Sequence, residues 1–306
     1  MNKKPNKIIS VVTANYLEDL VLGLLAQAFE PYIKRDFKAK NFQVSYIEHT
    51  AATAGIVLAV MALEGFRNKI YYHKKIEPKN PVNDYTSILT KLNNNFPSTK
   101  FKNYLTELFI ARDVVAHNHL YEVSYQYDDN YNVASCRQKL LKGYGDPKRK
   151  DKLLVKNNAR KTRQLNLNLQ PLKIGFEDLY TVLFFIDTTI AICQQQLGYG
   201  FIPFKPRHKV NGVYDENLSR ILANYYYKIP NSSFKDRIQK LTLDLKNDYQ
   251  EFIANNKFLI NGFTAYSFDT HYVIDNHCPK CEIFGYHKPD GDYCKECGYS
   301  LSIGQS

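Results

Sequence analysis

The sequence contains no Trp and only two Met, and four of its six Cys fall in two Cys-x-x-Cys pairs. The other two, Cys136 and Cys193, stand apart, so the pattern of a secreted disulfide framework is absent. The most apolar segment, 51–63, is about a third shorter than the ~20 residues needed to cross a bilayer. Glu18 and Asp19 interrupt the apolar stretch near the N-terminus, and no small-residue cleavage site follows. These absences predict a cytoplasmic protein without a membrane partner.

Acidic residues are outnumbered: 30 Asp and Glu stand against 41 Lys and Arg, which gives a net charge of +11 over 306 residues. A basic chain favours an acidic partner such as nucleic acid or a lipid headgroup surface. Aromatic residues make up 14% of the chain, almost all Tyr and Phe. They offer surfaces on which unpaired bases could stack.

Helical periodicity dominates the chain, which predicts a mainly α fold. Apolar residues recur at helical spacing over about 8–33, 44–72, 101–119, 176–197, 216–227 and 234–258. The middle of the second stretch is apolar all round, which indicates a helix at the centre of an antiparallel bundle.

The period changes to two after the third helix, which predicts an inserted β-hairpin. Apolar and polar residues alternate over 121–127 and again over 165–169, and we expect these two runs to pair. The segment between Arg137 and Arg163 holds eleven basic and two acidic residues, a local charge of +9.

This basic arm is the predicted RNA-binding surface, because clustered cations gain affinity by releasing counterions from a phosphate backbone. Its stacking candidates are Tyr125, Tyr127, Tyr131 and Tyr144. The alternative is a solvated loop whose Tyr residues pack on the sheet. The residues expected to contact RNA are Arg137, Lys148, Arg149, Lys150, Arg160, Lys161 and Arg163.

The C-terminal residues contain a four-Cys pattern: Cys278 and Cys281, twelve intervening residues, then Cys294 and Cys297 followed by Gly298. Two residues between paired thiolates let a turn aim both sulfurs at one ion, and two such pairs complete a tetrahedral structural Zn²⁺ site. We therefore predict a zinc ribbon. Its wider role is either contact with RNA or protein, or that of a structural cap.

A short polar motif closes the third helix: Arg112, Asp113, three apolar residues, His117, Asn118 and His119. An Arg, a polar residue and a His four to six positions later resemble the signature of HEPN ribonucleases, a family of all-α bundles. The resemblance covers about residues 41–200 and includes the long apolar helix that ends in the run 63–68.

The HEPN resemblance implies that Arg112 binds phosphate and His117 moves protons. Asp113 could orient His117 or raise its pKa, while Asn118 either bonds the scissile phosphate or caps the helix. His119 is a reserve for His117. A competing pair, Arg67 with His73, more plausibly closes the first core helix.

The chemistry supports these types of residue without the family. Cutting RNA without a metal needs a base for the 2′-hydroxyl, an acid for the leaving oxygen and a cation for the phosphorane. His titrates near neutral pH and Arg grips phosphate with paired hydrogen bonds. Five helical positions turn about 500°, which leaves Arg112 and His117 about 140° apart. One copy converges poorly, so we predict a homodimer with a composite site.

The predicted organisation has four parts, namely an N-terminal helical extension (1–40), an HEPN-like bundle (41–200) with the basic hairpin at 120–170, a helical connection (201–262) and the ribbon (263–306).

The expected function is that of a metal-independent endoribonuclease, which leaves 2′,3′-cyclic phosphates. The resemblance implies a role in bacterial antiphage defence, in abortive infection or in a toxin system, with an antitoxin or defence-system partner that neutralises the protein. The alternative is a non-catalytic RNA- or protein-binding adaptor. A metallohydrolase is disfavoured because no His, Asp or Glu cluster has open-site spacing.

Replacing one ribbon ligand tests the zinc prediction. We expect Cys294→Ser to lose the metal and unfold the C-terminal segment while the helical part survives, because a closed site folds a segment too short to have its own core. Elemental analysis measures the metal and circular dichroism measures the helices. Stoichiometric zinc in the variant would contradict the assignment.

Overall fold

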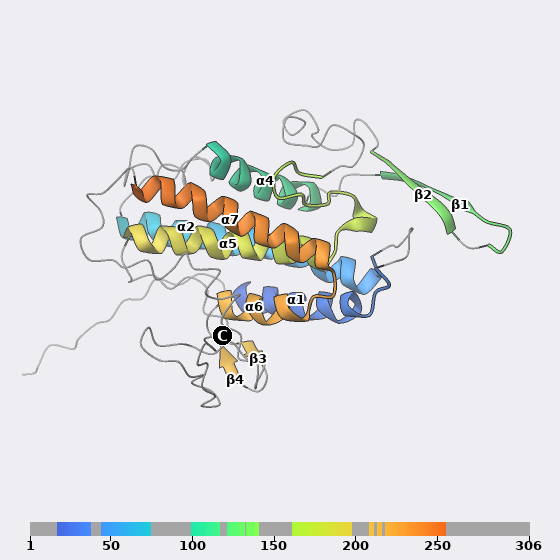
Figure 1. Cartoon of the computed structure of the whole chain (residues 1–306), viewed down its shortest axis with the longest axis horizontal. Helices are drawn as coiled ribbons and strands as arrows, with labels where there is room; N and C mark the ends of the chain where they lie inside the picture. Colours follow the sequence, from blue (N-terminus) through green and yellow to red (C-terminus); the bar gives the residue numbers. More distant parts are fainter. Residues whose placement is uncertain are drawn as a thin grey trace, which may run out of the picture.

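The computed structural model describes residues 17–37, 44–74, 99–116, 121–131, 133–140, 161–197, 208–210, 213–215 and 218–254. This part of the chain is mostly helical, as predicted (Figure 1). Its helices are α1 (Leu17–Ile33), α2 (Tyr46–Lys74), α4 (Thr99–Ala116), α5 (Phe176–Leu197), α6 (Leu218–Lys228) and α7 (Ser232–Ala254), with a 3₁₀ turn η2 (Pro171–Lys173).

Two small antiparallel sheets accompany the helices. Strands β1 (Tyr121–Tyr127) and β2 (Val133–Leu140) form a hairpin between α4 and α5 that projects from the helices (Figure 1). Strands β3 (His208–Val210) and β4 (Val213–Asp215) form a second, shorter hairpin before α6. The sequence offers a signal for it, since Asn211-Gly212 is the dipeptide that two-residue hairpin turns prefer.

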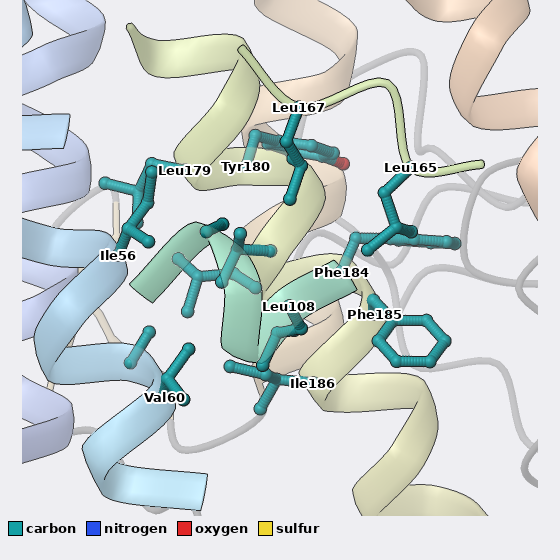
Figure 2. Close-up of a cluster of buried hydrophobic side chains, with 14 of the residues drawn as sticks. Ile56, Val60, Leu108, Leu165, Leu167, Leu179, Tyr180, Phe184, Phe185 and Ile186 are labelled. Atoms are coloured by element: carbon teal, nitrogen blue, oxygen red, sulfur yellow. The ribbon is translucent and has the colours of Figure 1, made fainter. Parts of the chain in front are cut away.

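Helix α5 is the centre of the core. Leu179, Val182, Leu183, Phe185 and Ile186 are all fully buried. Helices α1, α2 and α6 each pack against α5, and Tyr180 of α5 also donates a hydrogen bond to the carbonyl of Leu222 in α6 (3.0 Å) and stacks edge-on with Phe234 of α7. Figure 2 shows side chains of α2, α4 and α5 meeting in this cluster.

The expectation that the second helix lies at the centre of the bundle is wrong. Helix α2 packs against α1, α4 and α5 on one side. On the other side Tyr46, Ile47, Met61 and Tyr72 are exposed. The middle of the helix is apolar all round, but the bundle covers only part of its circumference.

The predicted pairing of 121–127 with 165–169 is also wrong. Strand β1 pairs instead with β2, with Tyr121 opposite Leu140 and Tyr125 opposite Cys136. Arg137 therefore lies within the hairpin rather than in its connection. The alternation over 165–169 is real, because Leu165, Leu167 and Leu169 are buried and Leu165 and Leu167 point into the core (Figure 2).

Buried carboxylates, not a partner strand, hold the backbone around 165–169. Glu107 of α4 accepts hydrogen bonds from the N–H groups of Gln164 and Leu165, the latter at 2.8 Å. Asp178 of α5 accepts from the backbone and side chain of Asn168 and from the N–H of Gly175. Since these amides point toward side chains, the segment cannot extend a sheet.

A third buried carboxylate fixes the start of α5. Glu48 of α2 accepts the N–H of Phe176 at 2.9 Å and forms a two-oxygen ion pair with Arg35. A Cβ at Gly175 would lie 2.5 Å from Glu48 Oε1, so any other residue here would force the paired carboxylate to shift. Segment 161–176 is therefore held by one carboxylate from each of α2, α4 and α5.

Burial raises the pKa of Asp178 from an ordinary 3.8 to about 6, although its backbone hydrogen bonds oppose the shift. The folded chain then holds this proton to a higher pH than the unfolded chain does. The contribution of Asp178 to stability is therefore full below about pH 4 and is lost as the pH rises to about 6. The loss is about 3 kcal/mol, at 1.36 kcal/mol per pKa unit.

Replacing Asp178 with Asn tests this linkage. We expect Asp178→Asn to be less stable at pH 4 by about 1–3 kcal/mol, because one buried N–H loses its acceptor. The variant should also lose less stability between pH 4 and 7 than the native chain, since Asn does not titrate. Urea unfolding followed by circular dichroism measures both effects. Asp236→Asn, at an exposed position of α7, is the control and should keep the native pH dependence. An Asp178→Asn variant with the native slope would contradict the account.

Candidate active site

Arg112 and Asp113 lie in the last turns of α4, four and three residues, respectively, before the helix ends at Ala116. Both side chains are half-buried. The neighbouring Ala111 and Val114 are buried and fix this end of the helix against the core. The other predicted catalytic residues, His117 and Asn118, and the reserve His119 lie outside the described residues.

The guanidinium of Arg112 sits between two carboxylates. Its Nη1 lies 3.3 and 3.4 Å from the two carboxylate oxygens of Glu64 in α2. Its Nε lies 2.8 Å from Asp113 Oδ1, in a geometry that makes an ion pair without an aligned hydrogen bond. The group also lies over the ring of Phe109, 5.6 Å from its centre. The cation is thus positioned at the junction of α2 and α4.

The competing cation, Arg67, lies one turn further along α2 from Glu64. Its Nε and Nη2 donate to the side-chain oxygen of the adjacent Asn68 at 3.3 and 3.2 Å. Its guanidinium lies 5.9 Å from the ring centre of Tyr71. The side chain of His73 lies outside the described residues, so the structure describes one half of each Arg–His pair.

An open groove of about 570 Å³ runs between α2 and the end of α4. Its walls are mainly apolar, and its polar groups are those of Tyr46, His49, Thr50 and Thr53. His49 is held in place, with Nδ1 3.2 Å from the carbonyl oxygen of Ile174 and 3.4 Å from Thr53 Oγ1. The remaining lining residues are Ala54, Val57, Leu58, Val115 and Ala116. The groove therefore ends where the chain leaves α4 toward His117.

Sequence reasoning did not identify Glu64 or His49 as neighbours of the site. Helical periodicity sorts residues into buried and exposed faces, but it does not say which side chain of another helix a given residue meets. The sequence did contain one signal: Glu64 and His49 are polar residues on a largely apolar helix. A polar residue in such a position needs a polar partner when it is partly buried.

The basic arm is described in part. Tyr125, Tyr127 and Tyr131 are exposed, and the rings of Tyr125 and Tyr127 lie 6.4 Å apart. The predicted contacts Lys148, Arg149, Lys150 and Arg160, with Tyr144, lie outside the described residues. The rings of Tyr125, Tyr127 and Tyr131 are therefore available for contact and are not packed on a core.

The two arm cations next to the bundle differ in exposure. Arg163 is exposed, whereas Lys161 is half-buried and forms an isolated β-bridge with Asn168. Burial lowers the pKa of Lys161, while nearby Asp178 works against that shift. Of the two, Arg163 is the better placed to reach a ligand.

The predicted zinc ligands Cys278, Cys281, Cys294 and Cys297 lie outside the described residues. Within the described ranges, no group of three His, Cys, Asp or Glu side chains could hold a metal ion. The zinc ribbon remains a prediction from the spacing of its cysteines.

By length and composition, α2 could cross a membrane over Tyr46–Lys69, the one such stretch in the described part of the chain. Half of its most apolar window is buried inside the bundle. The same composition suits a core helix that also carries an exposed apolar face.

Comparison with known proteins returned no match: no protein-family model, curated protein or solved structure is similar to this chain. The function proposed below therefore depends on the chain's own residues.

Proposed function

We propose that the chain is a metal-independent endoribonuclease of the HEPN type, which cuts RNA to a 2′,3′-cyclic phosphate and a 5′-hydroxyl. The observation that carries the proposal is Arg112, a half-buried cation in the last turns of a bundle helix, five positions before His117. A partly desolvated guanidinium binds a phosphate more strongly than one in bulk water.

The residues divide the reaction among them. Arg112 binds the scissile phosphate and stabilises the charge of the phosphorane. One His117 takes the proton of the 2′-hydroxyl, and a second delivers a proton to the leaving 5′-oxygen. Asp113 orients the guanidinium through its contact with Nε. Asn118 follows His117 and is the further candidate for a hydrogen bond to the phosphate.

Two catalytic His residues around one phosphate require two copies of the chain. The exposed apolar face of α2 supports a homodimer, because Tyr46 is 82% and Met61 is 44% exposed on a 29-residue helix. Such a helix is about 43 Å long and about 12 Å wide. Two such faces bury roughly 1,000 Å² in total, the lower limit for a specific interface.

The groove beside this face carries no Lys, Arg, Asp or Glu among its lining residues. An RNA backbone needs cations, so the groove suits an apolar protein surface better than a nucleic acid. In a two-fold interface each copy supplies the same surface, so the protruding Tyr46 of one copy can enter the groove of the other. The ends of the two α4 helices then lie next to the contact.

The position of the basic arm supports RNA as the substrate. The chain leaves α4 at Ala116 and returns where Glu107 of the same helix accepts the N–H groups of Gln164 and Leu165. Nine helical residues separate the two points, about 14 Å along the helix axis. The segment with the predicted charge of +9 is thereby held on the helix that carries Arg112 at its C-terminal end. Its N-terminal end, Arg137, lies in β2 and pairs with β1, the strand that carries the exposed Tyr125 and Tyr127.

We further propose that the C-terminal cysteines hold a structural Zn²⁺ ion, on the strength of their spacing. Zinc would fold the ribbon and take no part in the cleavage. The HEPN resemblance favours a cytoplasmic protein of a toxin or antiphage defence system, in which RNA cleavage stops growth and an antitoxin or defence-system partner restrains it.

A cleavage assay tests the proposed activity. We expect the native chain to cut unstructured RNA equally well with and without EDTA. His117→Ala should lose at least about 100-fold in rate, because general acid–base catalysis contributes that much. Arg112→Ala should lose at least about 100-fold as well, because a donor that stabilises the charge of the transition state contributes about 100- to 1,000-fold. The products should carry a 2′,3′-cyclic phosphate. RNA binding without cleavage by the native chain would indicate a binding adaptor instead. Activity abolished by EDTA, with the ribbon still folded, would indicate a metallohydrolase.

Charge introduced on the α2 face tests the homodimer. We expect Met61→Asp to weaken the dimer at least tenfold, because an unpaired charge in an apolar interface costs more than 1.4 kcal/mol. Sedimentation equilibrium measures the dissociation constant. Leu243→Asp is the matched control, since Leu243 is 47% exposed on α7. A native chain that stays monomeric, or a Met61→Asp variant with native dimer affinity, would contradict the proposed interface.

A further inference from the structure

We infer that Glu64 occupies the place of the RNA phosphate at Arg112 in the free protein and is displaced when RNA binds. The inference rests on the proposed function and assigns a role to a residue of α2 that the Arg–His motif does not contain. Glu64 is a competitor for the guanidinium and thus sets the affinity of the site for a phosphodiester.

The balance of charge around Arg112 is the first argument. Among the described contacts, two carboxylates, those of Glu64 and Asp113, face the one guanidinium that is proposed to bind an anion. The described contacts of Arg112 use Nη1 and Nε. A phosphodiester added without any other change would lie next to both carboxylates and be repelled by each of them. One carboxylate therefore has to move away.

The distances indicate which carboxylate moves. Asp113 is the next residue along the chain, and its oxygen lies 2.8 Å from Nε. Both oxygens of Glu64 point at the single Nη1 from 3.3 and 3.4 Å. These contacts are longer than the ~2.7–2.9 Å of strong charge-assisted bonds, and they are not the parallel two-nitrogen arrangement that Arg prefers. The Asp113 contact is shorter, although it is an ion pair without an aligned hydrogen bond. Glu64 makes the longer contacts and comes from another helix, so it can turn away while Asp113 stays next to Arg112 in the chain.

A second Arg–Glu pair, Arg35 with Glu48, is largely buried and serves as the comparison for a pair that stays formed. Glu48 is 1% exposed, pairs with Arg35 through both oxygens and also accepts the N–H of Phe176. Glu64 is 23% exposed and its partner Arg112 24%. Water can reach Glu64, so its carboxylate can turn into solvent without being left buried and unpaired.

RNA affinity measures the competition directly. Each variant carries His117→Ala so that a labelled, unstructured RNA is not cut, and binding is followed by fluorescence anisotropy at several salt concentrations. We expect Glu64→Gln to tighten binding about two- to fivefold, the change that the loss of a half-exposed ion pair produces. Glu30→Gln should have no such effect, since it removes the same charge from an exposed pair with Lys34 on α1.

A double variant separates competition from a general gain in positive charge. Adding Glu64→Gln to Arg112→Ala should not tighten binding, because Glu64 acts through the guanidinium. Glu64→Ala should tighten binding as Glu64→Gln does. Because Ala has a high helix propensity, this substitution should not destabilise α2. Thermal unfolding verifies that each variant is folded.

The outcomes distinguish this inference from the proposed function. If Arg112→Ala weakens RNA binding but Glu64→Gln and Glu64→Ala leave it unchanged or weaken it, Glu64 does not compete and the inference is wrong. If Arg112→Ala leaves RNA binding unchanged, the proposed phosphate site itself fails.

Discussion

Capture of backbone amides by buried carboxylates is the interaction on which the described fold depends. Glu48, Glu107 and Asp178 come from three different helices, and each accepts N–H groups of the segment between 161 and 176. Burial raises the pKa of all three carboxyl groups, because the ionised form is less favourable in the core than in water. As a result, this segment, which is irregular apart from the 3₁₀ turn η2, leaves none of these amides unpaired in the core.

This arrangement also connects the fold to the candidate site. Helix α4 carries Glu107 on its buried side and Arg112 near its end, so one helix both anchors the returning chain and presents the cation. The core packing that fixes α4 therefore fixes the distance between Arg112 and the root of the basic arm. A nuclease needs such a fixed relation, because a substrate held by the arm must meet the catalytic groups in a defined position.

The sequence predicted the helices well where apolar periodicity was uninterrupted. Helix α5 has the predicted bounds of 176–197, and α6 and α7 lie where their patterns placed them. The errors arose where side chains replaced backbone partners. The alternation at 165–169 is typical of a strand, but the positive φ of Asn166 and the carboxylates of Glu107 and Asp178 redirect its backbone.

The site was predictable only in part, for a similar reason. The Arg–His spacing drew attention to Arg112, and the structure places this residue at the end of a bundle helix. Its partner Glu64 lies 48 residues earlier in the chain, and such a contact depends on how α2 and α4 pack. Helices α1, α6 and α7, which the predicted four-part division places outside the bundle, contribute to the same hydrophobic core as α2, α4 and α5.

The central claim is that Arg112 and His117 of two copies act on one phosphate, and mixed dimers test it most directly. Native and His117→Ala chains would be mixed in equal amounts, unfolded together, refolded together and assayed for RNA cleavage. The account predicts that the mixture keeps about a quarter of the activity of the same total amount of native chain, because only native dimers bring two intact His117 side chains to one phosphate and a mixed dimer lacks the acid or the base. A mixture that forms mixed dimers but keeps about half of that activity would show that each chain cuts by itself and would contradict the account.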